Sequence, residues 1–235
     1  HCKDDKKTAR NPTSFAFLSL TSMENGVAVA DGVHSLKCYK LLPGMDKSKN
    51  LPTYLSMPVS KLAEKKVAKG KASEEDAKAG ADAAFGRITG TLDTAALADC
   101  DLVVEAIVEN LDVKKELFAS LGKVVKADGI FASNTSSFPI GEMAEASGRP
   151  SRFVGLHFFN PVHIMKLLEI VVHEGTSDSV LAACGGYGDD IGKTCITVKD
   201  FPGFATSRLG VCLGMEAIRM VEQGVASPQD IDTAM

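Results

Sequence analysis

The chain of 235 residues is long enough to bury one sizeable core, or one core and part of a second. Hydrophobic residues make up 45% of it and no apolar run approaches the length of a membrane span, so the composition predicts a soluble globular protein. The formal net charge of −4 argues against general nucleic-acid binding, which requires a basic face. The six cysteines lie far apart without a Cys-x-x-Cys pair, which argues against a zinc site or disulfide framework and is typical of a reducing compartment.

Residues 1–55 differ in character from the rest of the chain. They open with a basic stretch and continue with two short apolar runs, 15–18 and 27–29, before connections that contain Pro and Lys. We expect this segment to be separate from the domain that follows, and it need not form regular structure. Because the chain begins with His1 rather than Met, we also expect a fragment or a processed product whose targeting signal cannot be read.

The next residues predict a helical hairpin followed by a strand. Pro58 suits the first turn of a helix that Gly70 ends. Ser73 and the acidic residues after it begin a second helix that runs towards Phe85. Charged residues crowd both helices, so we interpret them as a solvated pair. The run 87–91 indicates a short strand.

Beyond residue 100 the chain alternates short buried strands with helices. Each strand run is apolar, contains β-branched or aromatic residues and is bounded by turn formers. This alternation predicts an α/β fold with a doubly wound, mainly parallel Rossmann-type sheet over residues 56–200, incomplete at its start, followed by an all-α domain. The expected strands are 101–107, 130–132, 153–156, 167–172 and 194–198, with helices at 113–124 and 177–193.

Polar side chains gather where two of these strands end, which is where open α/β sheets bind their ligands. The polar run 134–137 follows one strand, and His157 and Asn160 follow the next. A histidine here, taken alone, is more often a packing residue than a catalyst. An antiparallel return, however, would bring Glu169 beside its ring, and Ser136 supplies a hydroxyl. A base, a carboxylate that orients it and a hydroxyl that holds substrate form a general-base constellation.

Three strings in this region closely resemble one enzyme family: Asn-Thr-Ser-Ser at 134–137, Gly-Leu-His-Phe-Phe-Asn-Pro at 155–161 and Lys-Leu-Leu-Glu at 166–169. The sequence resembles the L-3-hydroxyacyl-CoA dehydrogenases, most nearly the short-chain 3-hydroxybutyryl-CoA type. The resemblance implies oxidation of a 3-hydroxyacyl-CoA to the 3-ketoacyl-CoA, with hydride transfer to NAD, in fatty-acid β-oxidation or butanoate metabolism.

The same resemblance assigns roles to the residues at the strand ends. It implies that His157 is the general base and that Glu169 is its partner. Ser136 then contacts the substrate and the nicotinamide, and Asn160 contacts both the substrate and the cofactor. These four residues form the centre of the predicted site.

The resemblance extends to three further positions. The string at 104–110 implies that Glu109 lies near the nicotinamide and that Lys114 reaches the CoA phosphates, so that we place Lys114 in both the substrate and the cofactor site. Without the resemblance, we would interpret Glu109 as a solvated acidic residue and Lys114 as a lysine on a helix surface. Residues 201–235 match the start of the family's helical second domain, where the active-site asparagine falls on Ser207. Serine also forms hydrogen bonds but has a shorter reach, and we place it among the substrate-binding residues.

The glycine-rich loop expected of this family is missing. A dinucleotide site needs a strand, a Gly-x-Gly-x-x-Gly loop and a helix whose N-terminus faces the pyrophosphate. The nearest match lies at 27–34 and its continuation, and it puts Asp31, Val33 and Leu36 where the glycines belong. Side chains at the turn block the approach of phosphate, so we predict poor NAD binding by this chain.

Two hypotheses remain open. The chain is an NAD-dependent 3-hydroxyacyl-CoA dehydrogenase, or it is an inactive fragment or non-catalytic relative that retains part of an acyl-CoA-binding surface. We expect an acyl-CoA partner, no metal, no nucleic acid and no membrane, in the cytoplasm or the mitochondrial matrix.

The ends of the matching region raise a question of assembly. The resemblance implies a homodimer for complete members of the family, whereas this chain stops at Met235, early in a truncated helical domain. If residues 14–33 do not supply the family's central first strand, strand 101–107 keeps an unpaired edge, and such edges promote aggregation.

Overall fold

The computed structural model describes residues 67–85, 88–91, 93–162 and 164–235, together with four short strands within 15–41. The predicted helix that begins at Pro58 therefore lies mainly outside the described residues. Its described end is followed by a turn in which Gly70 has a positive φ of 63°, as expected for a glycine that ends a helix. Ser73 caps the next helix by accepting a hydrogen bond from the Asp76 amide at 3.0 Å.

The main element of the fold is an eight-stranded sheet in the order β10-β9-β8-β7-β6-β1-β4-β5. The pairs β1·β6, β6·β7, β7·β8 and β9·β10 are parallel, and β8·β9, β1·β4 and β4·β5 are antiparallel. The prediction of a mainly parallel sheet is confirmed. Its strands are β1 (Phe15–Leu20), β4 (Leu36–Leu41), β5 (Ile88–Thr91), β6 (Leu102–Ala106), β7 (Ile130–Ser133), β8 (Phe153–Phe158), β9 (Leu167–Val172) and β10 (Thr194–Lys199).

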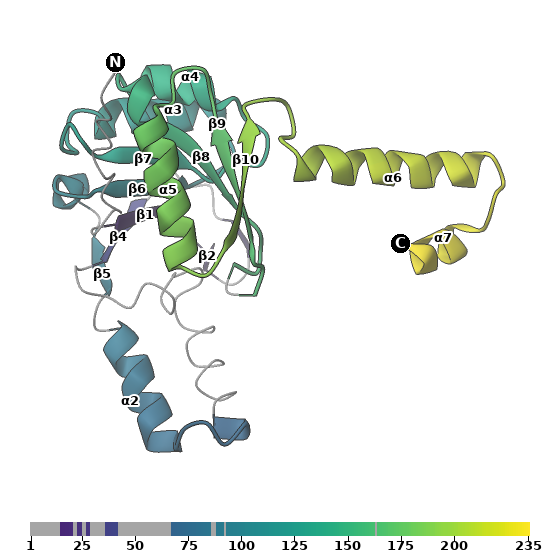
Figure 1. Ribbon diagram of the computed structural model, residues 1–235, viewed down its shortest axis with the longest axis horizontal. Helices are drawn as coiled ribbons and strands as arrows, with labels where there is room; N and C mark the ends of the chain where they lie inside the picture. The colour runs from purple at the N-terminus through teal and green to yellow at the C-terminus, as the bar shows by residue number, and fades with distance from the viewer. Residues whose placement is uncertain are drawn as a thin grey trace, which may run out of the picture.

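Helices lie on both faces of this sheet, as a doubly wound fold requires (Figure 1). One face is covered by α5, and the other by α3 and α4. Asn110 and Ser177 begin α3 and α5 because their side chains accept hydrogen bonds from the first turn. The helices are α2 (Glu74–Phe85), α3 (Leu111–Leu121), α4 (Ile140–Ala146), α5 (Asp178–Asp190), α6 (Thr206–Glu222) and α7 (Pro228–Ala234).

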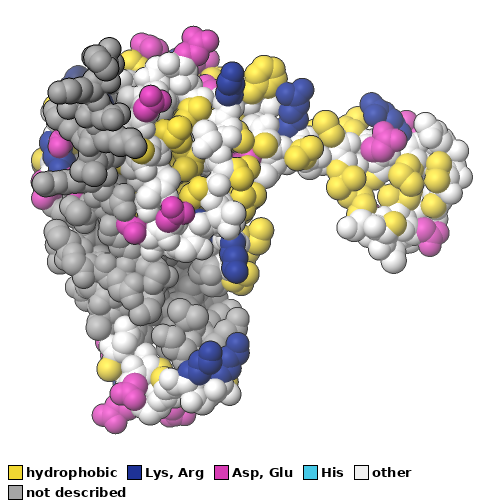
Figure 2. Space-filling view, viewed as in Figure 1, with side chains coloured by type: hydrophobic (Ala, Val, Ile, Leu, Met, Phe, Trp, Pro, Cys, Tyr) yellow, Lys and Arg dark blue, Asp and Glu magenta, His cyan; other side chains and the backbone are white. Residues whose placement is uncertain are grey.

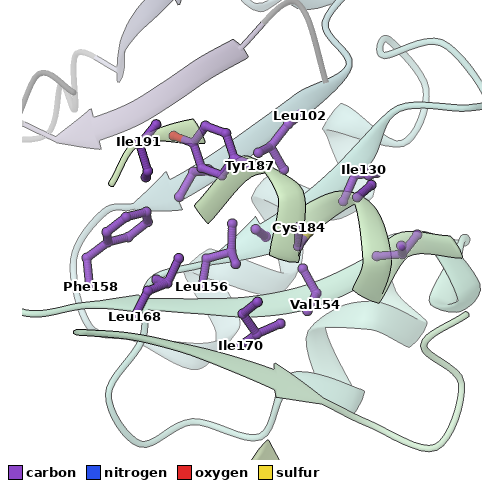
Figure 3. Packing of buried hydrophobic residues seen from close by; sticks show 14 of the residues in the cluster. Leu102, Ile130, Val154, Leu156, Phe158, Leu168, Ile170, Cys184, Tyr187 and Ile191 are labelled. Atoms are coloured by element: carbon purple, nitrogen blue, oxygen red, sulfur yellow. The ribbon is translucent and has the colours of Figure 1, made fainter. Parts of the chain in front are cut away.

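Gly188 of α5 lies where the helix packs closely against the sheet. Cys184 and Tyr187 point from α5 towards the buried side chains of β8, among them Leu156 (Figure 3). A Cβ on Gly188 would lie 2.1 Å from the Cys195 Sγ of β10, so only glycine lets the helix approach the sheet here. Glycine in the middle of a helix lowers the stability of that helix. At Gly188 this loss accompanies the close contact between α5 and the sheet, which a larger residue would prevent.

The opposite face is organised by aromatic rings and one arginine. The rings of Phe118 in α3 and Phe153 in β8 pack edge to face with centroids 4.5 Å apart. Arg149 donates hydrogen bonds to the carbonyls of Gly122 and Lys126, both at 2.6 Å. These carbonyls lie at and just beyond the end of α3, so the guanidinium satisfies acceptors that the helix leaves open.

The described residues within 15–41 contribute four strands to the fold. The strand β1 pairs in parallel with β6 and antiparallel with β4, so the edge of β6 is covered and the condition for an unpaired edge does not hold. The short strands β2 (Met23–Glu24) and β3 (Val27–Ala28) pair with each other in a separate two-stranded sheet. Val27 and Ala28 begin the nearest sequence match to the dinucleotide-binding pattern, and they pair with β2 and not with β6.

Beyond β10 the chain leaves the sheet, and α6 extends away from it towards α7 (Figure 1). None of the side chains of α6 is buried, and hydrophobic groups gather along the part of the chain that α6 and α7 form (Figure 2). Among the described residues, no helix combines the length and the apolar character needed to cross a bilayer. The exposed apolar residues of α6 are Leu209, Val211, Leu213, Met215, Ile218 and Val221.

Candidate active site

An antiparallel hairpin places a histidine opposite a carboxylate. Strands β8 and β9 pair antiparallel with His157 directly opposite Glu169. The Nδ1 atom of His157 lies 2.7 Å from Oε2 of Glu169. Both side chains are buried, with the histidine 5% exposed and the glutamate fully buried. The predicted antiparallel return that brings the two groups together is confirmed.

The Glu169 carboxylate has four hydrogen-bond donors around it. Besides His157, it accepts from the backbone amides of Ala205 and Thr206 at 3.1 and 3.0 Å, and from the Thr206 hydroxyl at 2.8 Å. Burial acts to raise the pKa of this carboxyl, but the hydrogen bonds from His157 and Thr206 outweigh it and hold the pKa below its ordinary value of 4.5. Because the folded-state pKa is lowered, this group stabilises the fold above pH 4.5 and loses that contribution as the pH falls through the lowered value.

The ionised carboxylate determines which ring nitrogen of His157 carries the proton. A carboxylate only accepts hydrogen bonds, so the neutral imidazole must hold its proton on Nδ1, facing Glu169. The other nitrogen, Nε2, then has a free lone pair and accepts a hydrogen bond from the Ser136 hydroxyl at 3.1 Å. This geometry leaves Nε2 ready to take a proton.

Neighbouring groups hold the histidine ring in place. The Phe159 ring lies 4.5 Å from it and the Phe204 ring 5.8 Å, measured between centroids. Asn134, at the end of β7, accepts a hydrogen bond from the Phe158 amide at 2.8 Å. The carboxyl ends of β7 and β8 are therefore tied together where the polar groups meet.

A second polar cluster lies at the ends of β6 and β7. Glu105 is completely buried in β6, where its carboxylate accepts from Lys114 Nζ at 2.5 Å and from the Ser133 hydroxyl at 2.6 Å. Lys114 also lies 3.1 Å from the half-exposed Glu109. Thr135 donates a hydrogen bond to Glu109. The cluster thus joins the loop after β6 to the loop after β7.

This cluster gives Lys114 a different setting from the helix surface that the sequence alone indicates. The side chain is 1% exposed and its ammonium is shared between Glu105 and Glu109, so the residue is not a solvated lysine of the helix surface. Glu109 keeps an accessible carboxylate at the carboxyl end of the sheet. The CoA-phosphate contact of Lys114 stays a prediction, and the ion pairs indicate that the residue also orders Glu109.

Lys114→Met should lower the free energy of unfolding by about 3–5 kcal/mol, because it leaves the Glu105 carboxylate buried without its cation. Lys115→Met is the matched control, because Lys115 pairs with Glu142 at 3.2 Å on the surface, where both side chains are at least a third exposed. The control should cost no more than about 1 kcal/mol. Urea unfolding of the two variants measures the difference, and equal losses would contradict a structural role for the buried pair.

The remaining predicted residues are Asn160 and Ser207, and no hydrogen bond described in the structure connects their side chains to either cluster. Asn160 is exposed in the loop after β8, in a cis peptide bond with Pro161. Lys193 ties that loop to the sheet by donating to the carbonyls of Val162 and of Met165, the latter at 2.7 Å. Burial lowers the pKa of this lysine. Ser207 lies half-buried in the first turn of α6.

Two residues of the site have no counterpart in the sequence predictions. Glu105 carries a detectable signal, since a carboxylate inside an otherwise apolar strand needs a buried partner, and Lys114 follows nine residues later on the next helix. Thr206 carries no such signal. Its contact with Glu169 joins positions 37 residues apart through the turn into α6.

Comparison with known families agrees with this arrangement. Residues 44–201 match the 3-hydroxyacyl-CoA dehydrogenase NAD binding domain, and residues 203–235 match the C-terminal domain of the same family. A probable 3-hydroxybutyryl-CoA dehydrogenase of Deinococcus radiodurans is 49% identical over 151 residues, covering 64% of this chain and 54% of the relative. The mitochondrial hydroxyacyl-coenzyme A dehydrogenase of Homo sapiens is 47% identical over 175 residues, covering 73% and 55%.

Solved structures give the same result. M. tuberculosis FadB2 aligns with a TM-score of 0.64 at 41% identity, covering 72% of this chain and 59% of that one. The (S)-3-hydroxybutyryl-CoA dehydrogenase PaaH1 of Ralstonia eutropha aligns with a TM-score of 0.65 at 36% identity, covering 73% and 59%. The chain spans about half the length of the curated relatives it matches. With its match to the NAD binding domain over more than half of its residues, the chain belongs to the 3-hydroxyacyl-CoA dehydrogenase family.

Proposed function

We propose that this chain carries the catalytic base of an NAD-dependent 3-hydroxyacyl-CoA dehydrogenase. One observation carries the proposal: Ser136, His157 and Glu169 form a hydrogen-bonded row in which the histidine proton faces the carboxylate. The names of the relatives, two of which are 3-hydroxybutyryl-CoA dehydrogenases, support an acyl-CoA with a short chain as substrate.

Each member of the row has a distinct task. The Ser136 hydroxyl holds the 3-hydroxyl group of the substrate, and Nε2 of His157 takes the proton from that hydroxyl as the carbonyl forms. Glu169 stabilises the imidazolium that results. When bound, NAD would accept the hydride from the substrate carbon that carries this hydroxyl. We assign the nicotinamide contact to Glu109, and contacts with both the substrate and the cofactor to Asn160; both residues follow strands at the same edge of the sheet.

The pyrophosphate end of NAD fits this chain less well. Asp31 and Val33 depart from the glycine loop and lie outside the described residues, and Leu36 is the first residue of β4. Among the described elements that follow β1, the next three are the strands β2, β3 and β4. A phosphate site needs a helix N-terminus after the first strand. We therefore assign the nicotinamide contacts to Glu109, Ser136 and Asn160 and assign no residue to the pyrophosphate.

A non-catalytic acyl-CoA-binding protein is the second candidate, and the departure from the glycine loop favours it. A homodimer is the assembly that we propose for complete members of the family, and not for this chain as given. The apolar side chains that α6 exposes here are a surface that such an assembly would cover. The wide spacing of the cysteines supports a reducing compartment, and the relatives include bacterial and mitochondrial proteins.

Formation of NADH with L-3-hydroxybutyryl-CoA tests the proposal. The chain should be assayed beside a variant in which residues 1–55 are replaced by a strand, a Gly-x-Gly-x-x-Gly loop and a helix. We expect turnover by the repaired variant, with the D enantiomer as the control substrate. A repaired variant that binds NADH but oxidises neither enantiomer would contradict the proposal, and acyl-CoA binding without turnover would favour the second candidate.

A further inference from the structure

The first turn of α6 closes on the carboxylate that orients the histidine. Thr206 donates its hydroxyl to Oε2 of Glu169 at 2.8 Å, and Oε2 is also the atom that lies 2.7 Å from His157 Nδ1. The backbone amides of Ala205 and Thr206 bind the other oxygen, Oε1. Each carboxylate oxygen is thus held from α6, and one of them is shared with the imidazole.

A strained turn delivers these donors to the site. Gly203 and Phe204 both have positive φ, at 77° and 49°, which reverses the chain between β10 and α6. A Cβ on Gly203 would lie 3.2 Å from the Arg208 backbone nitrogen, so the turn is also tightly packed. The Phe204 side chain is buried against His157. The turn therefore places the start of α6 over the histidine and its partner together.

We propose that Thr206 is a positioning residue for the general base, because its hydroxyl fixes the carboxylate oxygen that orients the His157 ring. It also connects the first helix of the second domain to the chemistry on the sheet. The inference rests on the proposed function for its catalytic meaning. The geometry around Glu169, and the experiment below, do not depend on turnover.

The hydroxyl adds a constraint that the two backbone amides do not supply. The amides restrain the last torsion of Glu169, which is broad for glutamate, through Oε1 alone. The Thr206 hydroxyl adds a restraint on Oε2, the oxygen that faces Nδ1 of His157. Valine has the shape of threonine without the hydroxyl, so Thr206→Val removes this one bond and keeps the backbone donors.

The surroundings of Glu169 make its titration a direct readout. Among the described residues, the titratable group hydrogen-bonded to it is His157, while its neighbour on β10 is the apolar Ile196. The hydrogen bond from Thr206 is one cause of the lowered pKa of Glu169, after the larger effects of burial and of the bond from His157. Removing the hydroxyl should therefore raise the pKa of Glu169.

Carbon-13 NMR of glutamate carboxyl groups in the unmodified chain tests this, with Glu169→Gln to assign the resonance. We expect Thr206→Val to raise the Glu169 pKa by about one unit, because a hydrogen bond to a charged group is lost. Thr206→Ser keeps the hydroxyl and should restore the wild-type titration. Thr197→Val, at an exposed threonine of the adjacent strand, is the matched control and should change nothing.

A second signal separates positioning from support of the fold. The resonance of the His157 Nδ1–H proton, which is bound to Glu169, should move in Thr206→Val, because its acceptor oxygen loses a second donor, and it should return in Thr206→Ser. An unchanged Glu169 titration and Nδ1–H resonance in folded Thr206→Val would overturn the proposal. If that variant does not fold, Thr206→Ala decides by the same two signals. Lack of turnover in the repaired variant that binds NADH would count against the proposed function and leave this result unaffected.

Discussion

His157→Gln should lower kcat for L-3-hydroxybutyryl-CoA by about 10²–10⁴-fold, the usual contribution of a positioned general base. The substitution is made in the unmodified chain if that chain is active, and otherwise in the variant with a restored glycine loop. The effect is expected because we propose Nε2 of His157, beside the Ser136 hydroxyl, as the proton acceptor, and glutamine offers no basic nitrogen there. Initial rates of NADH formation at saturating substrate give the comparison.

Two further variants make this test specific. Glu169→Gln should also slow turnover, because a neutral amide stabilises the imidazolium less than a carboxylate does. His173→Gln is the matched control for loss of a histidine. The His173 ring contacts the Pro150 carbonyl and the Gly175 amide, and the proposed reaction does not use it. Undiminished turnover in His157→Gln would refute the assignment of the base.

The unmodified chain should show no binding of NADH in the micromolar range, whereas the variant with the restored strand, glycine loop and helix should bind. A dinucleotide is held mainly through its pyrophosphate, on amides at a helix N-terminus that glycines expose. Asp31, Val33 and Leu36 occupy the nearest positions in the sequence. The contacts near Glu109, Ser136 and Asn160 orient the nicotinamide more than they anchor the molecule.

Calorimetric titration of both proteins with NADH measures this difference. Leu36→Gly in the unmodified chain serves as a control, because one glycine does not create the missing loop and helix. Micromolar binding by the unmodified chain would show that residues 1–55 form a cofactor site unlike the glycine-loop pattern. In that case the whole chain would be a candidate enzyme without repair.

Local sequence pattern was sufficient for most of the fold after residue 70. The strands from β5 to β10 and the helices α2, α3 and α5 occur where apolar spacing and capping residues predict them. The pairing of His157 with Glu169 was also predictable, because the two residues are twelve positions apart on neighbouring strands, and an antiparallel hairpin of that length has few possible registers. These features depend on neighbours along the chain, and the sequence displays such neighbours directly.

Contacts between distant segments were decided by the tertiary structure alone. Three contacts join groups whose pairing no periodic pattern in the sequence predicts. They are the pairing of β1 with β6, the ion pairs of buried Lys114 with Glu105 and Glu109, and the hydrogen bond from Thr206 to Glu169. The sequence determined which residues we propose for the chemistry. Packing decided what holds them, because a buried charge takes its partner from whichever element the fold brings within hydrogen-bond distance.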